Sequence, residues 1–248
     1  MRSSSNPGMR YAIWILATLS LAPNTQTAPS RRAEAEAIVA RYTTALGGTA
    51  AMSAVTSRVT RGTFDNGRGL VTPFVTWMKL PDKLATQIGR KDLGDVEGSG
   101  RASDGRIGWD KNFVGTGLRD LTAIELAEVK RTADPFRPAH LLATCSTVDL
   151  EERRDASGAT SQLVRCDLAD GVERWTFNSV TGLADRLDAT SRGGRTITII
   201  YDDYRRVDGL LTPFRERIAV PGATVTYAAN TISYNETVPD SVFAKPLR

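Results

Sequence analysis

The feature that most constrains the fold is a sequence period of two that begins at Thr56 and continues through most of the chain. Runs in which apolar and polar residues alternate are separated by short turn sequences such as Asn66-Gly67 and Asp208-Gly209. Asn-Gly or Asp-Gly between such runs is a strong short-range indication of a β-hairpin. The sequence therefore predicts a mostly antiparallel meander.

Three segments are expected to be helical instead. The segment RRAEAEAIVARYTTALGG ends at Gly47-Gly48, as helices tend to, and a short second helix is expected in TAAMSAV. Further along, Thr122 and Glu125 form a capping box that begins a helix expected over roughly Thr122 to Thr132. The apolar residues of the first helix recur at helical intervals: Ala35, Ile38, Val39, Tyr42 and Leu46.

No linker, composition shift or fixed-period repeat divides the chain after its first 28 residues. We therefore expect a single domain over residues 29–248. Its helices have to bury their apolar faces, and the simplest solution curls the antiparallel sheet around them. The predicted fold class is α+β, with one curved, mostly antiparallel sheet.

The first 28 residues are typical of a secretory signal peptide. Arg2 and Arg10 precede the apolar run YAIWILATLSLA, which is too short for a membrane span, and a polar stretch follows. Cleavage after Ala28 is favoured over cleavage after Ala22, because Pro23 would directly follow the latter cut. The expected location is the periplasm, with the mature protein soluble, since no lipid-acceptor cysteine occurs near this site.

Charge argues against a nucleic-acid partner. The formal net charge of +4 falls to +2 when residues 1–28, which contain two arginines and no acid, are removed. The sequence shows no cluster of basic residues that would concentrate this small charge on one surface. No motif for a metal, a phosphate or a catalytic nucleophile occurs either, so no cofactor is expected.

Both cysteines lie in the exported part, where a disulfide can form. If Arg153 pairs with Gly158 across a short turn, the same register places Cys145 opposite Cys166, and a cross-strand disulfide follows. The alternative is two free buried thiols.

Acidic residues near Tyr201 raise the question of catalysis. A hairpin turn at Asp208-Gly209 places Asp202 opposite Arg215, where an exposed ion pair explains it, and leaves Asp203 in need of a bulge. The hypothesis of an enzyme that uses Asp202, Asp203, Asp208 or His140 is therefore the least favoured of the functions considered.

The run LVTPFVTWMKL has apolar residues on both faces. Phe74 and Met78 share one face, and Val75 and Trp77 share the other, so the strand requires burial on both sides. A thick core explains this pattern, and so does a cavity that binds lipid or acyl chains.

Several segments together resemble the LolA-like superfamily of exported bacterial proteins. They are AEAIVARYTTALGG, DGRIGWD, LTAIELAEVKRTADPFRP, FNSVTGL, YDDYRRVDGLLTPF and PDSVFAKP, in this order. The resemblance implies an open, curved antiparallel half-barrel with helices covering its concave face. It also implies a hydrophobic cavity that holds acyl chains of lipoproteins or other lipids, without a catalytic motif.

The first hypothesis is a periplasmic carrier or chaperone for lipid or acylated lipoprotein, with transient membrane contact and a role in outer membrane biogenesis. The alternative is a non-catalytic sensory or assembly module that binds a protein partner in the cell envelope. Alternation predicts these cavity residues: Phe74, Trp77, Met78, Trp109, Leu126, Trp175, Phe177, Ile197, Ile199 and Tyr201.

Overall fold

The structure is a computed structural model that describes residues 30–89, 99–111, 117–154, 160–220 and 222–246. The predicted signal peptide, with its cleavage site at Ala28, lies outside the described residues. So do residues 155–159, which include the turn expected between the two cysteines.

The described strands form one 13-stranded sheet that does not close on itself. Every neighbouring pair is antiparallel, which confirms the predicted fold class. The strands are β1 (Ser57–Asp65), β2 (Val71–Lys79), β3 (Lys83–Ile88), β4 (Ser99–Ser103), β5 (Gly108–Lys111), β6 (Leu118–Asp120), β7 (Thr147–Arg154), β8 (Thr160–Leu168), β9 (Gly171–Phe177), β10 (Ala184–Ser191), β11 (Thr196–Val207), β12 (Leu210–Val220) and β13 (Ala223–Tyr234).

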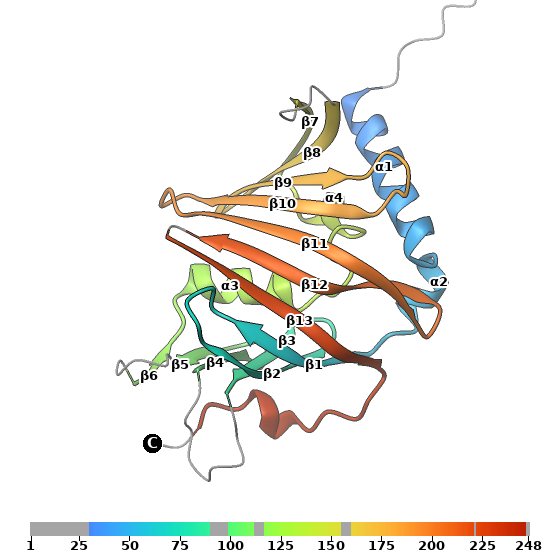
Figure 1. Ribbon diagram of the computed structural model, residues 1–248. Coiled ribbons are helices and arrows are strands. Elements are labelled where there is room, and N and C mark those ends of the chain that lie inside the picture. Colours follow the sequence, from blue (N-terminus) through green and yellow to red (C-terminus); the bar gives the residue numbers. More distant parts are fainter. Residues whose placement is uncertain (1–29, 90–98, 112–116, 155–159, 221, 247–248) are drawn as a thin grey trace, which may run out of the picture.

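The first and last strands meet in the middle of the sheet. β1 pairs with β2 on one side and with β13 on the other, so the strand order runs from β6 down to β1 and then from β13 down to β7 (Figure 1). Two meanders, one from each half of the chain, are thereby joined by a pairing that is remote in sequence. This central seam brings residues of β1 close to residues of β12 and β13.

Helices α1, α2 and α3 follow the sequence prediction closely, whereas α4 and η1 were not predicted. Helix α1 ends before Gly47, which has a φ of 136°, and α3 begins with the predicted capping box of Thr122 and Glu125. None of the described helices is long and apolar enough to span a membrane. The helices are α1 (Arg31–Leu46), α2 (Thr49–Ser53), α3 (Ala123–Thr132), α4 (Leu141–Thr144) and the 3-10 helix η1 (Asp240–Phe243).

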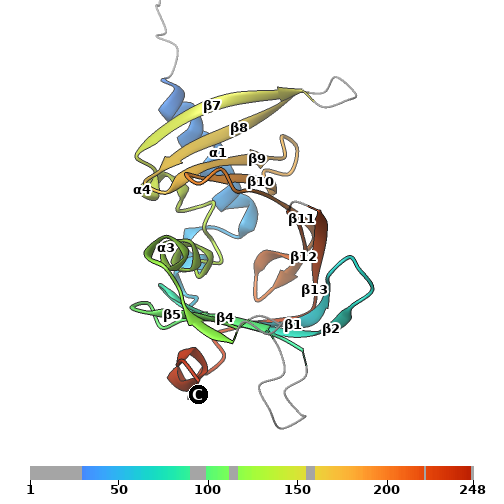
Figure 2. The same cartoon turned by 90° about the vertical axis from the view of Figure 1, so that its left-hand side faces the viewer.

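The sheet curves around α3, which lies inside the curve between the β1–β5 part and the β7–β10 part (Figure 2). Helix α1 packs against β7 and β12. Its buried residues Ala35, Tyr42 and Leu46 share the largest core cluster with Trp175. The helices thus fill part of the concave side. A ligand can bind only in the space that they leave open.

Strand β2 is covered on both faces, as its sequence requires. Phe74 packs with Phe64 and Ile88 on the inner side of the sheet. On the other side, Trp77 joins a separate cluster that includes Val59 and Phe243 of η1. The segment that follows β13 therefore covers the outer face of this strand.

The hairpin of β11 and β12 has the predicted register. Asp202 pairs with Arg215 in the ladder, and Asp208 and Gly209 form the turn with φ values of 48° and 86°. Asp203 has a φ of 55° and forms an ion pair with Arg205 at 2.7 Å, so it leaves the apolar face as expected.

A disulfide joins Cys145 to Cys166, whose Cα atoms lie 5.2 Å apart. The register predicted around it is wrong: Cys166 lies opposite Val148, and Arg153 lies opposite Ser161. Cys145 precedes β7, at the C-terminal end of α4, so the bond joins a helix end to β8.

Candidate ligand-binding cavity

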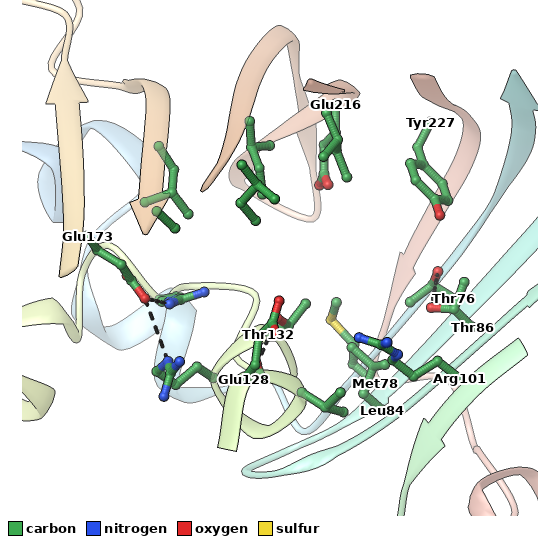
Figure 3. Close-up of a pocket in the computed structure, with 18 of the residues that line it drawn as sticks. Thr76, Met78, Leu84, Thr86, Arg101, Glu128, Thr132, Glu173, Glu216 and Tyr227 are labelled. Atoms are coloured by element: carbon green, nitrogen blue, oxygen red, sulfur yellow. Dashed lines mark hydrogen bonds and ion pairs between the residues drawn. The ribbon is translucent and has the colours of Figure 1, made fainter. Parts of the chain in front are cut away.

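A cavity of about 490 Å³ lies between α3 and the concave face of the sheet (Figure 3). Its walls combine aliphatic and aromatic side chains with a smaller number of charged groups. Apolar lining residues include Phe74, Met78, Leu84, Ile88, Val129, Leu187, Ile197, Ile199, Phe214, Ile218 and Tyr227.

Strand alternation explains one wall of the cavity. Phe74 and Met78 of β2 lie opposite Ile88 and Leu84 of β3, and all four line the cavity. Between them, the hydroxyl oxygens of Thr76 and Thr86 lie 3.0 Å apart. Because alternate residues of a strand share a face, this wall follows directly from the period of two.

Helix α3 forms the opposite wall. Ile124, Glu128 and Thr132 line the cavity at intervals of four residues, which place them on one side of a helix. Glu125 receives two hydrogen bonds from Arg119, at 2.8 and 2.9 Å, and these hold the beginning of α3 against β6. The hydrogen bond from Arg119 lowers the pKa of Glu125 to about 2, so this anchor is charged at neutral pH.

Four of the predicted cavity residues line this space. They are Phe74 and Met78 on β2, and Ile197 and Ile199 on β11. Their role in binding a ligand stays a prediction.

The other predicted residues lie elsewhere. Trp77 and Trp109 belong to the outer cluster around Phe243, on the opposite face of the sheet. Leu126 is half-buried on α3 but does not face the cavity. Three aromatic residues face inward but are packed into the core: Trp175, Phe177 and Tyr201.

Packing explains why the inward aromatics are not exposed to the cavity. The Tyr201 ring stacks on Trp175 with centroids 5.9 Å apart, and Tyr42 of α1 meets Phe177 edge to face at 5.5 Å. The Arg137 guanidinium lies 5.8 Å from the centroid of Trp175. Helix α1 and the segment after α3 thus fill this end of the curved sheet.

One group of charged wall residues is extensively paired. Glu173, which is 3% exposed, forms ion pairs with Arg137 and Arg131 and accepts a hydrogen bond of 3.0 Å from Trp175 Nε1. Arg131 also pairs with Asp170 at 2.7 Å. We call these four residues, Arg131, Arg137, Asp170 and Glu173, the paired network.

Sequence reasoning missed the paired network, although β9 carried an indication of it. Glu173 lies on the same face of β9 as Trp175 and Phe177, because alternate residues of a strand share a face. This pattern indicated that a carboxylate would be buried beside two aromatic rings. Its arginine partners come from α3 and the segment after it, about forty residues earlier. Only the folded chain brings them together.

A second group of charged wall residues is unpaired. Arg58 of β1 is 6% exposed, and its Nε is buried without a hydrogen-bond partner among the described residues. Glu216 of β12 also faces the cavity and forms no ion pair with any described residue. Alternation indicated this as well, since Glu216 lies between Phe214 and Ile218 on the apolar face.

The residues considered for catalysis are explained by local pairing. Asp202 pairs with Arg217 at 2.9 Å, and His140 Nδ1 lies 2.6 Å from Asp134 Oδ2. The hydrogen bond with Asp134 raises the pKa of His140. Among the described residues, no three His, Cys, Asp or Glu side chains converge in a way that could hold a metal ion.

Comparisons with known proteins support the fold and leave the activity open. No family model matches the sequence, and a search of curated proteins returned no match. A DUF1329 family protein from Desulfovibrio piger matches with a TM-score of 0.56 at 12% identity, over 87% of this chain and 98% of that chain. A LolA superfamily protein from Nitrosomonas europaea matches with a TM-score of 0.55 at 11% identity, over 85% and 97%.

A third solved structure, described as an outer membrane lipoprotein-sorting protein domain from Vibrio parahaemolyticus, has a TM-score of 0.55 at 8% identity, over 86% of this chain and 97% of that chain. At such identities the likeness concerns the fold. This chain has the fold of LolA superfamily proteins, and the resemblance seen in its sequence is confirmed at that level.

Proposed function

We propose that the protein is an exported carrier that binds the acyl chain of a lipid or lipoprotein in the cavity beneath α3. The observation that carries this proposal is the cavity of about 490 Å³ with its largely apolar wall. This volume falls in the range of about 300 to 1,000 Å³ that is typical of small-molecule sites. The role needs no catalytic group.

The energetics of such binding are favourable without polar chemistry. Each methylene group removed from water contributes about 0.8 kcal/mol. Apolar side chains from β2, β3, β11 and β12 face the cavity, so an alkyl chain would meet apolar contacts on several sides. The likeness in fold to the domain described as lipoprotein-sorting from Vibrio parahaemolyticus supports this class of ligand.

The location we propose is the periplasm, reached after removal of residues 1–28. The arginine-flanked apolar run at the N-terminus supports export. N-terminal sequencing of protein recovered from a periplasmic fraction tests this, and a chain that still begins at Met1 would contradict it.

The decisive experiment is native mass spectrometry of protein purified from a bacterial periplasm, with organic extraction of what co-purifies. A stoichiometric lipid or acylated peptide is the expected result. Protein that stays unliganded after incubation with a lipid extract would contradict the carrier proposal. A protein partner recovered without lipid would instead favour a sensory or assembly module.

Strand β2 offers a matched pair of variants, because Phe74 lines the cavity and Trp77 lies on the outer face. Phe74→Ala is expected to weaken binding of a fluorescent fatty acid about tenfold, which corresponds to about 1.4 kcal/mol of lost apolar contact. Trp77→Ala is expected to leave that affinity unchanged. Titration of both folded variants tests this, and equal losses would contradict the assignment of the cavity.

A further inference from the structure

The cavity wall contains a buried guanidinium that nothing in the described chain neutralises. Arg58 lies on β1, opposite Met78 of β2 and Tyr234 of β13. It is 6% exposed and lines the cavity, yet its Nε has no hydrogen-bond partner among the described residues. Buried polar groups are almost always satisfied, so an unsatisfied one calls for a partner outside the described residues.

A carboxylate of opposite charge faces the same space. Glu216 of β12 lies between Tyr201 of β11 and Tyr227 of β13 in the ladder. Its neighbours in sequence, Arg215 and Arg217, point to the other face and pair with Asp202 at 3.6 and 2.9 Å. They do not neutralise it.

The surroundings of Glu216 are largely apolar and aromatic. Phe214, Ile218 and Tyr227 line the cavity beside it. Burial raises the pKa of the Glu216 carboxyl, and the Arg58 guanidinium opposes that rise. Both groups line the same cavity, and they form no ion pair with each other in the structure.

Neighbouring charges on the wall make the contrast clear. Arg101 is 3.1 Å from Asp110, and the members of the paired network neutralise one another. Burying a charge without a partner is costly, so the unpaired state of Arg58 and Glu216 is informative. Arg58 and Glu216 are available to a molecule that enters the cavity.

We propose that Arg58 and Glu216 bind a zwitterionic headgroup, one that carries an acidic oxygen group and an amine in the same ligand. This inference rests on the proposed function, because the alkyl chain of the same ligand occupies the apolar remainder of the cavity. A guanidinium recognises phosphate or carboxylate oxygens through its planar fork. Glu216 attracts the ammonium, and the nearby Phe214 and Tyr227 rings add cation–π attraction.

The test uses ligands that share a twelve-carbon chain and differ in the head. We would measure binding by isothermal titration, below micelle concentrations, for dodecylphosphocholine, dodecyl phosphate, dodecyltrimethylammonium and dodecyl maltoside. The wild-type protein is expected to bind the zwitterion about tenfold more tightly than the other three, a difference of about 1.4 kcal/mol.

Two variants assign the halves of the headgroup. Glu216→Gln is expected to remove the advantage of the zwitterion over dodecyl phosphate, and Arg58→Gln to remove its advantage over dodecyltrimethylammonium. Glu152→Gln is the matched control, because Glu152 is an exposed glutamate on β7 that does not line this cavity. It is expected to leave the order of affinities unchanged.

Thermal melting followed by circular dichroism establishes that each variant is folded. If Arg58→Gln does not fold, Arg58→Lys replaces it; this variant keeps the charge but loses the fork, and is expected to lose part of the advantage. Equal binding of all four heads would overturn the headgroup inference and leave the carrier proposal standing. Zwitterion preference that survives in both variants would overturn the residue assignment, and binding of none of the four would overturn the carrier proposal as well.

Discussion

The cavity wall carries two kinds of buried charge, and they differ in how they are compensated. In the paired network, Glu173 joins two arginines, and Arg131 continues the chain of ion pairs to Asp170 at 2.7 Å. At the central seam of the sheet, Arg58 and Glu216 face the same cavity without a partner among the described residues. The charges of the paired network neutralise one another, whereas Arg58 and Glu216 remain available to a ligand in the cavity.

The difference indicates which charges serve the fold and which serve a ligand. Removing one partner of a buried pair leaves an uncompensated charge, whereas removing an unpaired charge relieves a penalty. Stability measurements therefore distinguish the two groups, and the following predictions are ordered by the size of the expected effect.

The largest effect is expected from breaking the paired network. Glu173→Gln leaves Arg137 buried beside Trp175 without its carboxylate. Burial lowers the pKa of Arg137 to about 10, so the guanidinium remains charged at neutral pH. We expect the free energy of unfolding to fall by about 3 to 5 kcal/mol in urea denaturation.

Glu128→Gln controls for the loss of a cavity carboxylate that has no ion pair with the described residues. Its free energy of unfolding is expected to stay within about 0.5 kcal/mol of wild type. Equal effects of the two substitutions would show that pairing at Glu173 contributes nothing to stability.

The unpaired carboxylate is expected to behave in the opposite way. The pKa of Glu216 is raised above its ordinary value of 4.5, so the wild-type protein loses stability as pH rises from 4.5 through the pKa of the folded state. The Glu216→Gln variant has no carboxyl group to ionise at this position, so it does not lose this stability as pH rises. We expect the variant to be more stable than wild type at pH 7 by on the order of 1 kcal/mol.

The same two proteins should have similar stability at pH 4, where Glu216 is mostly protonated in both the folded and the unfolded state. Urea denaturation at both pH values provides the comparison. A variant that is less stable than wild type at neutral pH would show that Glu216 has a stabilising partner and is not available to a ligand.

The smallest effect is expected at the exposed pair of His140 and Asp134, because solvent weakens the attraction between charged groups at the surface. The side chain of His140 is 53% exposed, and its pKa is raised by the hydrogen bond with Asp134. Its stabilisation is present below the unfolded value of 6.5 and is lost as pH rises through the folded pKa.

His140→Gln is therefore expected to reduce the free energy of unfolding slightly at pH 5.5 and not at pH 9. Chemical denaturation at the two pH values measures the difference. A loss of equal size at pH 9 would mean that the imidazole stabilises the fold through packing and not through its charge.

Local features were predictable because neighbouring residues determine them. The capping box of Thr122 and Glu125 begins α3, and the Asp208-Gly209 turn sets the register of β11 and β12. The register of β7 and β8 was predicted wrongly, since their connection is longer than a two-residue turn and allows several pairings. Turn type determines register only where the turn is short.

The candidate site was less predictable. Alternation correctly places Phe74 and Met78 on one face of β2 and Trp77 on the other, but it does not show which face lines a cavity. Nor does it distinguish an open part of a face from a part that is packed beneath a helix. Trp175 and Tyr201 face inward and are covered. Trp77 faces outward and is half-buried there, because Phe243 of η1 packs in the same cluster on that face of the sheet.

The sequence by itself determined the antiparallel meander, the two main helices and, in β2 and in the hairpin of β11 and β12, which residues of a strand share a face. These features depend on contacts within a turn of helix or across a hairpin. The tertiary structure decided how the sheet curves around α3 and which buried charges find partners. Arg131 meets Asp170 across 39 residues of chain, and β1 pairs with β13, the last strand of the described chain. Such long-range contacts depend on the curvature of the whole sheet, which no local pattern specifies.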